Sequence, residues 1–176
     1  VGAGTTTINV NPLTTMAAKV AGVTSANGGL QGAYDAAKAA TANTDVAKAF
    51  GLTGDVTKLD ATPVIKADGT VNTTASELGK VLAALSGVDA KTGGLQATID
   101  AYVPTAGAVI SNTALNNIKT DLIEGAAATQ AKLGTTDLVK AVATVLAAGS
   151  STAGYSMDAI ATDDVIDATP SMNAAA

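Results

Sequence analysis

The amino-acid sequence predicts a mainly α-helical protein, a bundle of about six to eight short helices with an N-terminal strand and a small β-hairpin. Apolar residues recur at three- and four-residue spacing along most of the chain. Asn, Ser, Thr or Asp stands before many of these stretches and glycine after several of them, as at helix starts and ends. We expect residues 1–176 to form a single domain, with 1–11 as an N-terminal strand or arm and 168–176 as a frayed tail.

The chain begins with a short segment that has the alternation of a strand. Residues 5–10 are mostly β-branched and carry no charge. One face of this predicted strand holds Thr6, Ile8 and Val10, and the other holds Thr5, Thr7 and Asn9.

Three helices are predicted in the first third of the chain. Asn11 followed by Pro12 is typical of a helix start, and this helix is expected to reach about residue 23. A second helix is expected over 30–42. Thr44 and Asp45 then favour the start of a short third helix that ends at residue 50.

The helical spacing is lost between residues 52 and 74. Asp68-Gly69 lies there between two β-branched stretches, a setting typical of a tight β-hairpin. An exposed loop fits the same residues.

The remaining helices follow in the second half of the chain. Thr74 and Glu77 have the spacing of a capping box, which predicts a helix from there to about residue 86. Further helices are expected at residues 95–102, 112–133, 136–148 and 157–166.

One pattern suggests an internal duplication. Residues 13–36 align with 78–101 at a constant offset, and ten of the 24 positions are identical, including a shared GGLQxxxDA run. We interpret the two stretches as related helical hairpins, each turning at a Gly-Gly pair. Similar composition arising independently is the alternative, since Ala and Gly are abundant in this chain.

The side chains that are missing exclude several classes of function. The chain has a net charge of −5 and contains no His, Cys, Trp or Arg. Without His and Cys it has no Ser-His or Cys-His nucleophile and no imidazole or thiolate ligand for a transition metal. We therefore expect no enzyme, no catalytic residue, no cofactor and no metal site. Acidic character with few aromatic residues argues against nucleic acid as a partner, and no apolar run is long enough to span a membrane.

Near the C-terminus, four aspartates form the densest acidic cluster of the chain. They lack the alternate spacing, the glycine and the terminal glutamate of a calcium-binding loop. We interpret the cluster as solvated charge rather than an ion site. Its members are Asp158, Asp163, Asp164 and Asp167.

Two short motifs carry a resemblance to a known class of proteins. Residues 10–15 read VNPLTT, and residues 47–52 read AKAFGL. In this respect the first 60 or so residues resemble a helical "VxPLTT" module of large bacterial exported surface and extracellular-matrix repeat proteins. The resemblance implies an exported, adhesive or matrix-forming protein without catalytic residues. This chain differs from the large repeat proteins in being short.

These observations lead to an expectation about function. We expect a structural subunit of an extracellular bacterial filament or surface layer, which associates with copies of itself through residues 5–10. The alternative is a monomeric adhesion or binding module of a larger secreted surface protein, with other surface proteins or glycans as partners. The absence of cysteine and the start at Val1 instead of Met fit a processed protein located outside the cell or on its surface. Residues 5–10 could equally pair with the predicted hairpin of their own chain.

Overall fold

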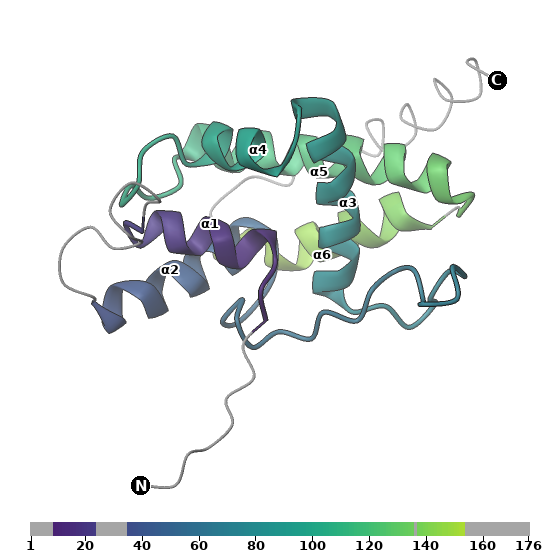
Figure 1. Cartoon of the computed structure of the whole chain (residues 1–176), viewed down its shortest axis with the longest axis horizontal. Coiled ribbons are helices and arrows are strands. Elements are labelled where there is room, and N and C mark those ends of the chain that lie inside the picture. Colours follow the sequence, from purple (N-terminus) through teal and green to yellow (C-terminus); the bar gives the residue numbers. More distant parts are fainter. Residues whose placement is uncertain (1–8, 24–34, 136, 154–176) are drawn as a thin grey trace, which may run out of the picture.

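The computed structural model describes residues 9–23, 35–135 and 137–153, and it confirms a mainly α-helical protein (Figure 1). Within these ranges there are six helices and no β-strand. The helices are α1 (Pro12–Val20), α2 (Ala36–Ala49), α3 (Glu77–Thr92), α4 (Leu95–Tyr102), α5 (Asn112–Leu133) and α6 (Leu138–Ala153). The helix predicted at 157–166, the tail at 168–176 and the acidic cluster lie outside the described residues.

Helix α1 begins where the sequence predicts. The Asn11 side chain accepts hydrogen bonds from the backbone N–H groups of Leu13 and Thr14, at 2.9 and 3.1 Å. In return, the backbone N–H of Asn11 donates to the Thr14 hydroxyl at 2.9 Å. This reciprocal cap satisfies N–H groups that have no partner within the helix. The helix ends at Val20, earlier than predicted, and Gly22 follows it at φ +96°.

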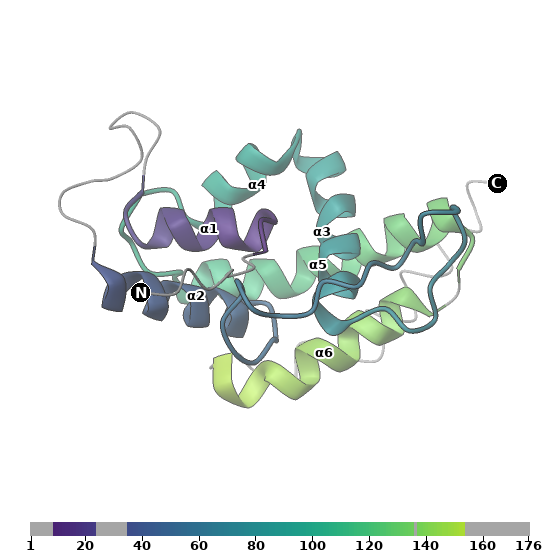
Figure 2. The ribbon, with the colours of Figure 1, turned by 60° about the horizontal axis from the view of Figure 1, so that its bottom comes forward.

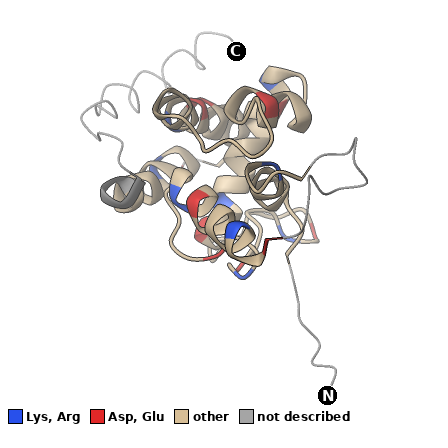
Figure 3. Ribbon diagram, turned by 90° about the vertical axis from the view of Figure 1, so that its left-hand side faces the viewer, with Lys and Arg blue, Asp and Glu red and all other residues tan. Residues whose placement is uncertain are grey.

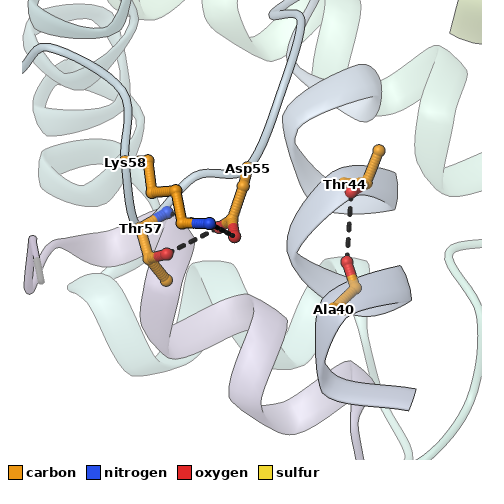
Figure 4. A network of polar contacts seen from close by, with 5 residues as sticks. All are labelled: Ala40, Thr44, Asp55, Thr57 and Lys58. Carbon is orange, nitrogen blue, oxygen red and sulfur yellow. Dashed lines mark hydrogen bonds and ion pairs between the residues drawn. The ribbon is translucent and has the colours of Figure 1, made fainter. Parts of the chain in front are cut away.

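The two helices predicted at 30–42 and 44–50 are in fact one helix within the described residues. Helix α2 begins after Asp35, whose side chain accepts from the N–H groups of Ala37 and Lys38. It passes through Thr44 without a break, and the Thr44 hydroxyl donates to the carbonyl of Ala40 at 3.1 Å (Figure 4). Thr44 thus bonds the preceding turn of its own helix instead of capping a new one.

The segment between α2 and α3 is held by a repeated local turn. In each case an Asp or Asn side-chain oxygen accepts from both the backbone N–H and the hydroxyl of a Thr two residues later, at 2.6–3.1 Å. Figure 4 shows the first of these turns, with Lys58 beside it. The repeat satisfies polar groups that a non-helical segment would otherwise leave to water. The pairs are Asp55 and Thr57, Asp60 and Thr62, Asp68 and Thr70, and Asn72 and Thr74.

Two predictions in this segment are wrong in detail. The hairpin at Asp68-Gly69 is present only as a tight turn with a single antiparallel bridge between Ile65 and Val71, not as two strands. Thr74 does not cap α3, because its hydroxyl is taken by the turn with Asn72. Ser76 caps the helix instead, accepting from the Gly79 N–H at 2.9 Å.

The Asp-Thr turns should make stability sensitive to acid. Burial raises the pKa of Asp55, but the hydrogen bonds from Thr57 and the charge of Lys58 outweigh it, so the net pKa is below 3.8. The Thr70 hydroxyl and N–H lower the pKa of Asp68 in the same way. A pKa that is lowered on folding contributes stability that is fully present above the unfolded value and is lost as pH falls through the folded one.

We therefore expect the double variant Asp55→Asn/Asp68→Asn to lose less stability than the wild type between about pH 7 and about pH 2.5. Asparagine keeps an oxygen for the turn but does not titrate. Urea unfolding followed by circular dichroism measures this difference. Asp137→Asn, at an exposed aspartate without a Thr two residues later, serves as the control. If this control flattens the pH dependence as much as the double variant, the turns are not its source.

Within the described residues, the two stretches that align in sequence differ in where their helices begin and end. Gly22 ends α1 with φ +96°, whereas its counterpart Gly87 lies inside α3. Asp35 caps the start of α2, whereas its counterpart Asp100 lies within α4. Helix α3 continues to Thr92, beyond its predicted end, whereas the Gly-Gly pair of the first stretch lies outside the described residues.

Helix α3 lies at the centre of the bundle and crosses α5 at very short range (Figures 1 and 2). Glycine permits this crossing: a Cβ added to Gly87 would lie 2.1 Å from the carbonyl oxygen of Gly125. The core of the described residues is formed mainly by aliphatic side chains, together with Phe50 and Tyr102. Its largest fully buried members are Phe50, Leu13, Met16, Leu78, Leu85, Ile99, Ile118, Leu122 and Leu146.

Candidate functional site: an apolar groove and a short backbone edge

The predicted assembly strand enters the described structure only at its last two residues. Thr5, Thr6, Thr7 and Ile8 lie outside the described residues, and Asn9 and Val10 are not in a strand, contrary to the prediction. Asn9 is anchored to the segment between α2 and α3 by two hydrogen bonds. Its backbone N–H donates to the carbonyl of Thr57 at 3.1 Å, and its side-chain amide donates to the carbonyl of Leu59. Val10 projects into solvent, with 90% of its surface exposed.

A groove of about 480 Å³ lies between α3, the C-terminal end of α5 and the segment 61–65. The segment rests directly on α3, because a Cβ at Gly79 would lie 1.9 Å from the carbonyl oxygen of Thr62. Small side chains on α3 then leave the space open. Most of the wall is apolar, with Val64, Ile65, Leu82, Ala83, Ala128 and Leu133 contributing to it. Lys132 is the one charged residue in the lining.

Beside the groove, the turn at Asp68-Gly69 presents a short backbone edge. Two hydrogen bonds flank the bridge between Ile65 and Val71: Lys66 N–H to the Thr70 carbonyl at 2.9 Å, and Asn72 N–H to the Val64 carbonyl at 2.7 Å. In this arrangement the N–H and C=O of the bridged residues point away from each other. Within the described residues, the N–H and C=O of Ile65 make no hydrogen bond. Ile65 therefore belongs both to an open edge and to the groove wall.

Other polar contacts in the described structure join helices. The Tyr102 hydroxyl of α4 donates to Asp121 of α5 at 2.7 Å. Burial and this hydrogen bond raise the pKa of Tyr102 far above its ordinary value. The Thr98 hydroxyl donates to Asp89 at 2.6 Å, which ties α4 to α3. These contacts hold the helix packing and leave the tyrosine unreactive as a base.

A second, smaller hollow of about 230 Å³ contains two carboxylates, Asp121 and Glu124. Each is already engaged, Asp121 by the Tyr102 hydroxyl and Glu124 by an ion pair with Lys91. The causes that raise the pKa of Lys91 are its hydrogen bond and its charge interaction with Glu124. This arrangement suits a link between α3 and α5 better than a pair of catalytic acids.

Charged residues of both signs occur along the described part of the chain. Acidic and basic residues are interspersed along the ribbon in Figure 3. The described residues contain no group of three or more Asp and Glu side chains that could hold a metal ion. In the same part of the chain, no helix is both long and apolar enough to cross a bilayer.

No family model, curated protein or solved structure matches this chain. The sequence did not predict the groove. The sequence feature that could have indicated the groove is a series of small residues on α3, Gly79, Ala83 and Gly87, which recur every four positions and so share one face of the helix.

Proposed function

We propose that this protein is a structural subunit of an extracellular bacterial filament or surface layer, which self-associates through residues 5–10 and catalyses no reaction. The duplicated sequence and the N-terminal strand are part of this proposal: residues 5–10 become a strand when they pair with another chain. Other surface proteins and glycans are the further partners that fit such a location.

The observation that carries the proposal is the position of Val10. It ends an uncharged, β-branched segment, and it is held at the surface because Asn9 is hydrogen-bonded to Thr57 and Leu59. A large apolar side chain that is 90% exposed beside a fixed anchor is suited to contact with another molecule. The missing His, Cys and Arg support a structural role over a chemical one.

We expect Val10→Asp to abolish concentration-dependent polymerisation while leaving the unfolding free energy within about 0.5 kcal/mol of wild type. A charge at this position opposes burial in an interface, but it costs the monomer little where the side chain is solvated. Sedimentation velocity over a concentration series, with negative-stain imaging, measures the assembly. Val109→Asp is the matched control, because Val109 is 78% exposed in the loop before α5.

Two results would contradict the proposal. One is a wild-type chain that remains at 17.0 kDa at every concentration; a monomer of this kind favours the adhesion-module alternative. The other is equal loss of assembly in both Asp variants, which would indicate a general effect of charge.

A further inference from the structure

We propose that the groove and the Ile65 edge are the acceptor for residues 5–10 of a second copy of this chain, which add to the edge as a strand. This inference rests on the proposed function and names the surface that completes it. The donor and the acceptor are different parts of the chain, so the contact is heterologous and repeats head to tail.

The chemistry of the donor fits the acceptor. A strand added beside residues 63–66 would bond the N–H and C=O groups of Ile65 that have no partner among the described residues. Side chains of an added strand alternate between the two faces of the pair. Thr6, Ile8 and Val10 share one face of the predicted donor strand. When this face lies on the same side as the Ile65 side chain, Ile8 is directed toward the apolar wall of the groove. No acidic residue lines the groove, and the donor carries no charge.

The anchor at Asn9 favours a second copy over the same chain as the donor. Ile8 is one residue from Asn9, so its Cα stays about 3.8 Å from that of Asn9. Asn9 is bonded at Thr57 and Leu59, whereas the groove contains Lys132 and Leu133 from the far end of α5. Figures 1 and 2 both show the segment between α2 and α3 running from the start of α1 past α3 toward that end of α5. The groove wall begins at Ala61, close to this anchor, but Ile65 lies six residues beyond Leu59. A second copy can place Ile8 beside Ile65 without disturbing the hydrogen bonds of Asn9, which favours it as the donor.

Residues 154–176 are the competing occupant, because they include several apolar side chains. They also carry the four aspartates of the acidic cluster, against one lysine in the groove lining. The uncharged segment 5–10 suits a mainly apolar groove better, since charged groups near such a wall lose solvation.

Disulfide trapping tests the assignment cleanly, because the chain has no cysteine of its own. Thr6→Cys is mixed with Ala128→Cys, a change at an exposed groove position, under mild oxidation at a concentration where the chain polymerises. We expect a covalent heterodimer on a non-reducing gel. Asn116→Cys, exposed on the same helix and outside the groove, should link to Thr6→Cys at least tenfold more slowly.

The outcomes separate this inference from the function on which it rests. Polymers without the Thr6–Ala128 link overturn the acceptor assignment and leave the structural role standing. Faster linkage of Ala128→Cys to Met157→Cys than to Thr6→Cys assigns the groove to the C-terminal segment and also overturns it. A chain that neither polymerises nor links refutes the proposed function itself.

A blocking variant gives a second readout that does not depend on oxidation. Ala128→Trp should fill the groove and reduce polymer by at least tenfold while the helical circular dichroism signal is retained. Ala131→Trp, exposed on the same helix and outside the lining, should assemble like wild type. Normal polymerisation of Ala128→Trp would overturn the assignment.

Discussion

Gly125→Ala is expected to destabilise the protein by about 3 kcal/mol or more, even though alanine is the better helix former. A Cβ at this position would lie 2.2 Å from the carbonyl oxygen of Ala84 and 2.9 Å from the backbone N of Val88. Both atoms belong to the backbone of α3, so no side chain can rotate away. Relief requires α3 and α5 to separate at the centre of the bundle, which would open the core on both sides.

Urea unfolding monitored by circular dichroism measures this loss, and Gly134→Ala is its matched control. Gly134 has open space around its Cβ but a left-handed φ of +65°, so the same chemical change should cost only about 1 kcal/mol. If Gly125→Ala costs no more than Gly134→Ala, the contact between α3 and α5 is not as close as described.

Phe50→Ala should cost about 3–5 kcal/mol of unfolding free energy. Phe50 is fully buried where α2 ends, and its ring meets that of Tyr102 edge to face at a centroid distance of 6.3 Å. It is the only phenylalanine of the chain, and a core with so many alanines offers few large side chains to move into the space. The cavity left by the truncation is therefore expected to remain open.

Thermal and urea unfolding compare this variant with Val109→Ala, a truncation at an exposed apolar side chain. We expect the control to stay within about 0.5 kcal/mol of wild type. A loss below about 1.5 kcal/mol for Phe50→Ala would mean that neighbouring side chains collapse into the cavity.

Helices whose ends are specified locally could be predicted from sequence. Asn11 and Pro12 start α1 as expected, and Ser111 and Gly134 bound α5 close to the predicted range 112–133. In each case the capping atoms lie within a few residues of the groups they satisfy. The chain around them does not need to be folded for the preference to act.

The predictions failed where one residue had two local choices. Thr44 could cap a helix or continue one, and Thr74 could cap α3 or complete a turn with Asn72. The structure takes the second choice in both cases. Asp68-Gly69 likewise favours a tight turn, but the flanking residues form only one bridge. The chain on either side is bonded elsewhere, since the backbone N–H and the hydroxyl of Ser76 donate to the Thr62 carbonyl.

The candidate site also has one part that the sequence can predict and one part that it cannot. Residues 5–10 could be selected from sequence because alternation and lack of charge are local properties, and their role in assembly stays a prediction. The groove could not be selected. It exists because the segment 61–65 and the end of α5 meet the small residues of α3, and these three parts are far apart in the sequence.

The sequence by itself determined that the protein is helical, where most of its described helices lie, and that His, Cys and Arg chemistry is absent. Composition and capping are sufficient for these conclusions because they depend on residue type and short spacing. Only the tertiary structure decided that Gly87 and Gly125 form a backbone contact, that Asn9 is anchored at Thr57, and that Ile65 borders an apolar groove. Each of these depends on the packing of distant segments, which a single sequence read by local pattern does not specify.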